Sequence, residues 1–218
     1  LPISAAANFE FILYADDTTL VNSLCSFQIS ARPNYDNISE NINSELNRVY
    51  DWLAANKLSL NISKTKYMVF HFPQRKVNMN FNLQINNIPV EKTSEFNFLG
   101  LQIHETLSWI SHINKISNKL SRIIGILKRL RNSIPLSGLL LIYNSLFLPH
   151  LNYSILAWGH SCERIFKLQK KAVRLICNTN FYAHTEPLFK QLNMLKVLDI
   201  LYLDRKSTRL NSSHTVIS

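Results

Sequence analysis

The chain has 218 residues, of which 46% are hydrophobic, so it is long enough for one or two domains with a buried core. It has only four glycines and lacks the G-x-x-x-x-G-K and G-x-G-x-x-G motifs, so nothing supports nucleotide binding of those types. No run of 18 apolar residues occurs, and we expect no membrane span. Zinc and disulfide sites are not indicated, because no C-x-x-C spacing joins the three cysteines, which we expect to be buried thiols: Cys25, Cys162 and Cys177.

The net charge of +10 is concentrated in one segment. Residues 1–108 contain eight lysines and arginines against ten acidic residues, whereas residues 109–178 contain eleven against a single acidic residue, Glu163. Such an excess suits a polyanion, and the alternative is a set of solvated helix faces. Nucleic acid is a better candidate than an anionic membrane, because the basic segments lack a clean interfacial apolar face.

The first predicted elements are two strands joined by a tight turn over residues 9–24. The sequence EFILYADDTTLV places Asp16 and Asp17 between two runs of strand-forming residues. Neighbouring side chains of a strand point to opposite faces, so both carboxylates reach one side only where a turn breaks the alternation. The pattern indicates either a solvated turn or a site for a divalent cation such as Mg²⁺, which prefers oxygen ligands.

A helix and short strands follow in the first half. Residues 26–37 have the composition of a loop. Apolar residues at helical spacing from Ile38 to Leu53 predict an amphipathic helix, which Asn37 or Ser39 caps and which ends at residues 54–56. Strands are predicted over residues 57–62, over residues 67–72, and as several short pieces within residues 77–103.

Helices dominate the second half. Apolar residues recur every three or four positions from Trp109 to Leu130 and predict a helix, and Pro135 stops this run. Three more helices are predicted over residues 136–147, 163–178 and 185–203. The tail, residues 205–218, has no apolar face and is predicted to be disordered.

Several segments together resemble one family. YADD, with a strand on each side, is similar to the catalytic hairpin of reverse transcriptases. Further segments match in order: WLAANKLSLNISKTKYMVF, FLGLQIHETLSWISHI, LIYNSLFLPHLNYSILAWG, LQKKAVRLI and AHTEPLFKQLNMLKV. The set resembles the reverse transcriptases of non-LTR, LINE-type retrotransposons, within them the jockey-like elements, over about residues 1–204.

The resemblance implies an α+β fold, in which a partial polymerase palm precedes an all-helical basic thumb and a C-terminal helical region. The palm remainder, made of a β-hairpin, a helix and short antiparallel strands, would cover residues 1–107. The thumb helices would cover residues 108–160, and the C-terminal helical region residues 161–204. Residues 205–218 lie outside the resemblance and look like translated sequencing-adapter sequence, so we expect no function there.

The implied activity is RNA-directed DNA polymerisation by two-metal nucleotidyl transfer, with Mg²⁺ or Mn²⁺ as the cofactor. By this resemblance Asp16 would be the main metal ligand and Asp17 the supporting carboxylate. Ala15 would let the primer end come close, and Tyr14 would support the hairpin. Lys64 would either donate a proton to the leaving pyrophosphate or only contact phosphate.

The resemblance implies two further contact regions. Phe98, Leu99 and Gly100 would form a primer-grip turn, where Gly100 permits a bend or a close backbone approach. For Phe98 and Leu99 the alternative is plain core packing. The residues expected to bind nucleic acid through its phosphates are Lys115, Lys119, Arg122, Lys128, Arg129, Lys167, Lys170, Lys171 and Arg174.

The three tryptophans have two interpretations. Trp52, Trp109 and Trp158 could stack on bases. Trp52 and Trp109 lie at or beside apolar positions of the predicted helices, which favours the core for both.

Two classes of function remain open. The first is a fragment of a retroelement polymerase, with an RNA template, a DNA primer and deoxynucleoside triphosphates as partners, no membrane, and a route through cytoplasm and nucleus. No upstream palm aspartate or fingers segment precedes Tyr14, so we expect the chain alone not to polymerise. The second is a non-catalytic, nucleic-acid-binding remnant of a degenerate element. The sequence does not fix the oligomeric state.

Overall fold

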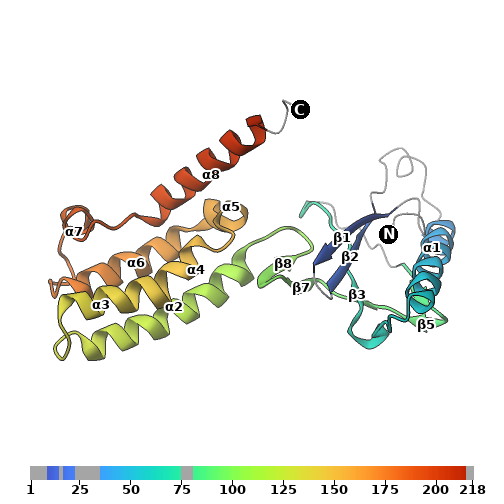
Figure 1. The fold of residues 1–218 in the computed structure, drawn as a ribbon, viewed down its shortest axis with the longest axis horizontal. Coiled ribbons are helices and arrows are strands. Elements are labelled where there is room, and N and C mark those ends of the chain that lie inside the picture. Colours follow the sequence, from blue (N-terminus) through green and yellow to red (C-terminus); the bar gives the residue numbers. More distant parts are fainter. Residues whose placement is uncertain (1–8, 15–16, 23–34, 75–80, 215–218) are drawn as a thin grey trace. The chain divides into compact units, whose positions relative to one another are not determined.

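The structure is a computed structural model of the chain, and it describes residues 9–14, 17–22, 35–74 and 81–214 (Figure 1). The chain forms two compact units, Leu1–Glu95 and Phe96–Ser218. Helices account for 56% of the chain and strands for 15%, which agrees with an α+β fold at a coarse level. The last β-hairpin lies almost entirely in the helical unit, because only its first residue, Glu95, belongs to the first unit.

The predicted strand–turn–strand element is present. Strands β1 (Glu10–Tyr14) and β2 (Asp17–Val21) pair antiparallel, with Glu10 opposite Val21 and Tyr14 opposite Asp17. Aromatic and β-branched side chains favour this extended pairing. Ala15 and Asp16, between the two strands, lie outside the described residues, as does most of the predicted loop at residues 26–37.

The first helix, α1 (Tyr35–Ala55), begins three residues earlier than the periodicity predicts and ends where it predicts. Its apolar face packs against the buried side chains of Phe81, Leu83 and Ile85. Its asparagines bind the backbone next to that face: Gln84 N–H donates to Asn43 Oδ1 at 2.9 Å, and Asn86 N–H donates to Asn47 Oδ1 at 2.9 Å. The asparagine side chains on α1 therefore accept hydrogen bonds from backbone N–H groups that a neighbouring strand would bind in a wider sheet.

Two of the predicted strands are mostly absent. Residues 57–61 form no strand, because Lys57 has a left-handed backbone (φ 60°) and Asn61 caps a short 3₁₀ helix, η3 (Ile62–Lys64). Of residues 67–72, only Tyr67 is in a strand, β3 (Lys66–Tyr67). This strand pairs parallel with β6 (Glu91–Lys92), which corrects the expectation of antiparallel strands throughout. The parallel pair forms because the chain between them crosses over through another hairpin.

Asn-rich turns join short strands, as predicted for residues 77–103. Strands β4 (Gln84–Ile85) and β5 (Ile88–Pro89) form a hairpin whose two turn residues, Asn86 and Asn87, have φ of 50° and 62°. Asparagine tolerates this left-handed region, and positive φ at both turn positions matches the twist of the strands. A further hairpin, β7 (Glu95–Phe98) and β8 (Leu101–His104), precedes the helices.

Most helices of the second unit pack around one core (Figure 1). Leu188 and Phe189 form a second, smaller buried cluster with Val173. Helix α2 lies beside α6, and the α3–α4 segment runs back along them. The core includes Leu120 and Leu127 from α2, Phe147 and Leu151 from the middle segment, and Ile165 from α6, all fully buried. The elements are α2 (Ile110–Leu130), α3 (Leu136–Ile142), a π-helix η4 (Tyr143–Phe147), α4 (Leu148–Asn152), α5 (Ile155–Trp158), η5 (Gly159–Ser161), α6 (Glu163–Ile176), α7 (Thr185–Gln191) and α8 (Val197–His214).

Three helix boundaries differ from the predictions. The second helix of the predicted thumb region does not end before Pro149 but continues through η4 into α4. Pro149 lies in the first turn of α4, where its missing backbone N–H is not needed. The helix predicted over residues 185–203 is two helices, separated at Asn193, whose φ is 50°. Residues 205–214, predicted to be disordered, continue α8, and Ser207 and Thr208 donate their hydroxyl groups to carbonyls one turn earlier.

The predicted buried thiols are found in part. Cys162 is buried and Cys177 half-buried, and both are free; burial raises the pKa of each thiol. Cys25 lies outside the described residues.

No single helix within the described ranges is long and apolar enough to span a membrane, although the bent pair Leu136–Asn152 and Ile155–Ser161 reaches that length and composition together. Much of this pair is core, because Leu139, Tyr143 and Phe147 are buried in the helical unit.

A buried amide joins three parts of the helical unit. Gln169 on α6 is fully buried; its Nε2 donates to the Tyr143 hydroxyl at 2.9 Å and to the Leu195 carbonyl at 2.8 Å. The N–H of Val197, the first residue of α8, donates to Gln169 Oε1 at 2.9 Å. Burial raises the pKa of Tyr143 to about 12, so this hydroxyl stays neutral at ordinary pH.

We expect Gln169→Leu to lower the free energy of unfolding of the helical unit by about 3 kcal/mol, because it leaves the buried Tyr143 hydroxyl and the Val197 N–H unpaired. Urea unfolding of the full chain, followed by helical circular dichroism, measures the loss. Gln191→Leu, at the exposed end of α7, is the matched control and should change stability by less than about 0.5 kcal/mol. Equal effects of the two substitutions would contradict the role of Gln169.

Candidate functional site

The YADD turn is the first candidate site. Asp17 is exposed at the start of β2 and stands opposite Tyr14, so only Ala15 and Asp16 connect the strands. Such a two-residue connection is a tight turn, in which the strand alternation breaks. The predicted main ligand, Asp16, lies outside the described residues.

The donor set at this turn suits a hard divalent cation in part. The exposed carboxylate of Asp17 is an oxygen ligand of the kind that Mg²⁺ takes, usually one or two at a time. No group of three or more His, Cys, Asp or Glu side chains gathers anywhere in the described ranges. Among the described residues of this turn, Asp17 is therefore the oxygen ligand that the structure places.

Lys64 lies at the end of η3 in the same unit. Its backbone N–H donates to Asn61 Oδ1 at 3.3 Å, and its side chain is exposed. No hydrogen bond or ion pair between Lys64 and Asp17 is found among the described residues.

The predicted primer-grip turn is a tight hairpin turn. Leu99 and Gly100 connect β7 to β8, with φ of 46° and 85°. The Tyr153 hydroxyl donates to the Leu99 carbonyl, and the Tyr153 ring lies 3.6 Å from the place where a Cβ on Gly100 would stand. Phe98 and Leu99 are half-buried, so full core packing does not describe either of them.

Two residues of α2 also hold this hairpin. Lys115 Nζ donates to Asn97 Oδ1 at 3.2 Å, and the Gln102 N–H donates to His112 Nδ1 at 3.2 Å. The backbone of Tyr153 is itself fixed, because Trp158 Nε1 donates to its carbonyl at 2.9 Å. The hairpin is therefore fastened to the helices on both sides of its turn.

His112 is buried between two tryptophans, with ring centres 5.9 Å from Trp109 and 6.0 Å from Trp158. Burial first, and then the charges of Lys115 and Lys119, lower its pKa. Because Nδ1 accepts a hydrogen bond, the neutral ring carries its proton on Nε2, for which the described residues offer no partner. Trp158 is fully buried, so its ring has no free face for bases. Trp109 is half-buried and packs on the core, as its core interpretation predicts.

The basic helices form the second candidate site, and the structure divides its nine predicted cations into two groups. Three make internal contacts: Lys115 binds Asn97, Lys170 Nζ lies 4.2 Å from the Phe166 ring centre, and Arg174 Nε donates to the Ala183 carbonyl at 2.9 Å. The other six are exposed and have no such contact among the described residues: Lys119, Arg122, Lys128, Arg129, Lys167 and Lys171. These six are the stronger candidates for phosphate contacts.

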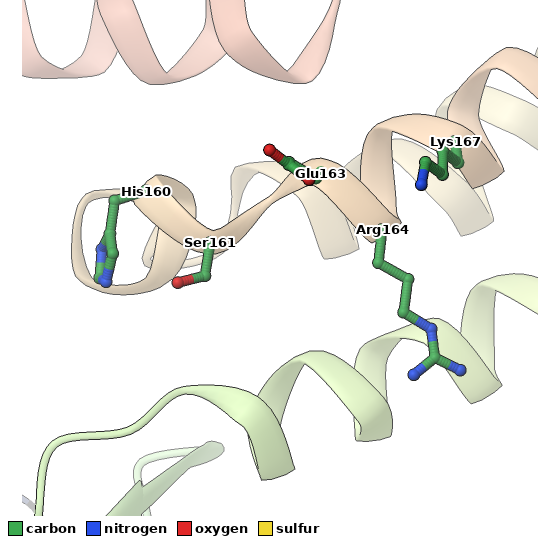
Figure 2. Close-up of a pocket in the computed structure, with 5 residues that line it drawn as sticks. All are labelled: His160, Ser161, Glu163, Arg164 and Lys167. Carbon is green, nitrogen blue, oxygen red and sulfur yellow. The ribbon is translucent and has the colours of Figure 1, made fainter.

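The exposed cations belong to two helices that lie side by side. Arg164 on α6 donates to Asn114 Oδ1 on α2, so the first turns of the two helices are joined. Figure 2 shows Arg164 extending from α6 toward α2, and Arg164 lines a surface depression together with His160, Ser161, Glu163 and Lys167. The prediction did not place His160, Ser161 and Arg164 in a site. Of the three, only Arg164 carried a sequence signal, because it lies three residues from Lys167 on the same helix face.

No protein-family model, no curated protein and no solved structure matches the chain. The family named by resemblance therefore remains a prediction.

Lowering the pH from 7 to 5 should loosen the β7–β8 hairpin. His112 has a lowered pKa in the folded chain, so the unfolded chain binds a proton first, and stability falls as the pH drops below the usual value of about 6.5. Protonation of Nδ1 also removes the acceptor for the Gln102 N–H. Hydrogen exchange of the Gln102 amide, followed by NMR against pH, measures the opening.

The matched variant is His112→Asn, because an amide oxygen can accept the same hydrogen bond and does not titrate. It should reduce the rise in Gln102 opening between pH 7 and pH 5. An unchanged pH dependence in this variant would assign the effect to other groups, His150 first, whose pKa burial and Lys119 also lower.

Proposed function

We propose that the chain is part of an RNA-directed DNA polymerase of a mobile element, with carboxylates in the β1–β2 turn and a template–primer surface on the basic helices. The observation that carries this proposal is the pairing of Tyr14 with Asp17, which puts the YADD sequence at the tip of an antiparallel hairpin. A tight turn is the one place in a strand pair where adjacent carboxylates reach the same ion.

The charge of the helical unit supports the same proposal. Six exposed cations on α2 and α6 have no internal contact among the described residues, and one acidic residue, Glu163, occurs between residues 109 and 178. Lysine and arginine in such numbers bind a nucleic-acid backbone through its phosphates, without regard to sequence. The rigid attachment of the β7–β8 turn to α2 would let that turn and the cations hold one primer strand together.

Asp16 and Asp17 are the residues that would hold Mg²⁺ or Mn²⁺ in this proposal. Bound there, the ions would activate the attacking primer oxygen and stabilise the leaving pyrophosphate of a deoxynucleoside triphosphate. Lys64, exposed on η3, would contact the triphosphate or protonate its leaving group.

The second candidate function is nucleic-acid binding without catalysis. The observation in its favour is the set of six exposed cations on α2 and α6, which can contact phosphates without any carboxylate or metal. Both functions require the basic helices, and only the polymerase requires the aspartates.

Metal binding at the turn tests the polymerase proposal directly. Mn²⁺ added to the full chain should broaden the NMR signals of Tyr14 and Thr18, which flank the turn, and Asp16→Asn or Asp17→Asn should remove most of that broadening. Asp51→Asn, at an exposed position on α1, is the control and should leave it unchanged. Absence of broadening at the wild-type turn would favour the binding-only function.

In a polymerase that contains this chain, Asp16→Asn should abolish Mg²⁺-dependent primer extension and leave the affinity for template–primer nearly unchanged, because the carboxylate acts on the metal and not on the phosphates. Loss of both together would show that the substitution damages the fold.

Salt dependence tests the helical surface. Arg122→Gln and Lys171→Gln should each lower the slope of log affinity for an RNA–DNA duplex against log salt by about one unit. Arg48→Gln, on an exposed position of α1, is the control and should not change the slope. Equal slopes in all of these proteins would remove the two cations from the interface.

A further inference from the structure

Two large aromatic side chains stand exposed in the loop between α6 and α7. Phe181 is 65% exposed and Tyr182 is 84% exposed. Their rings meet edge to face, with centres 5.4 Å apart and planes at 88°. Exposed aromatic faces are costly in water, so a neighbouring pair of them calls for a binding role.

The loop that presents this aromatic pair is held in place by α6. Arg174 Nε donates to the Ala183 carbonyl at 2.9 Å, and the Thr179 N–H donates to the Arg174 carbonyl at 3.0 Å. The guanidinium carbon of Arg174 lies 5.9 Å from the centre of the Phe181 ring. The pair therefore sits on a preorganised loop, and binding would lose little conformational entropy.

Cations lead along α6 to the aromatic pair. Lys167, Lys171 and Arg174 follow one another at spacings of four and three residues, so they lie on one face over about 10 Å of helix. Lys167 also lines the depression at the start of α6 (Figure 2). A row of positive charge thus ends at two exposed rings.

We propose that this surface, the Phe181–Tyr182 pair with the Lys167–Lys171–Arg174 row, binds single-stranded nucleic acid. Unpaired bases stack on the exposed rings, and the backbone follows the cations. A duplex presents no free base faces to the rings, so the pair distinguishes single strands from duplex. The proposal does not depend on the polymerase function, because it uses no carboxylate and no metal.

Charge complementarity selects this occupant over a protein segment. An apolar protein partner would use the two rings alone and leave the neighbouring row of cations facing it without compensation. A nucleic-acid strand uses both the π faces and the positive charge, which occur together at single-strand sites.

The test compares a fluorescent twelve-residue oligo-uridylate with a blunt duplex of mixed sequence, both titrated with the full chain. Tyr182→Ala and Phe181→Ala should each weaken single-strand binding by roughly tenfold and leave duplex affinity and the salt slope unchanged. Lys171→Gln should weaken both ligands and lower both slopes. The matched control is Tyr202→Ala, a 67% exposed tyrosine on α8, which should change neither affinity.

Tyr182→Trp gives a second readout, since it keeps a stacking surface: it should retain affinity, and its indole emission should be quenched when the oligonucleotide binds. Full single-strand affinity in both alanine variants would overturn the proposal and leave a protein partner as the better occupant. Equal losses for strand and duplex would also overturn it, because stacking would then not be the cause.

Discussion

The helical unit depends on one buried amide. Gln169 reaches the π-helix through Tyr143, the segment after α7 through the Leu195 carbonyl, and the start of α8 through the Val197 N–H. Each of these hydrogen bonds joins α6 to another element. Apolar packing alone would not fix the position of these elements along α6. Because buried polar groups tolerate few alternative geometries, this amide fixes the rotation of α6 as well as its position. The outward face of α6, with its lysines, follows from that rotation.

The spacing of the core residues therefore also determines where the basic residues lie on the helices. On α2, Ile113, Leu120 and Leu127 recur every seven residues on the buried face, and the cations occupy the positions between them. A helix whose apolar side is fixed must present its remaining side to solvent. The structure refines this picture, because three cations turn back to an aromatic ring, an asparagine or a carbonyl and leave six outward.

Periodicity predicted the long helices and failed for contacts that join distant residues. Helices α1, α2 and α6 lie where apolar spacing places them, and the β1–β2 hairpin follows from strand formers around a tight turn. The strand predicted at residues 57–62 is absent. The left-handed backbone of Lys57 and the capping side chain of Asn61 favour a turn and a 3₁₀ helix over the extended strand that the alternating apolar residues predict. The sequence did not indicate the roles of Tyr153 and Gln169, because their hydrogen-bond partners lie 54 and 26–28 residues away along the chain. The sequence shows that Phe181 and Tyr182 are neighbouring aromatic residues, but it does not predict that their side chains are exposed.

The two candidate sites belong to different compact units, so the proposed metal site and the proposed nucleic-acid surface can be tested separately. Asp17 begins the second strand of a two-stranded hairpin, which in isolation is only marginally stable in water, and Ile12, Leu13 and Tyr14 on it are exposed. The cations stand on helices whose own core is complete around Leu120, Phe147 and Trp158. The described core of the helical unit is built from that unit's own residues, so we expect a substitution in the hairpin to leave the basic helices folded.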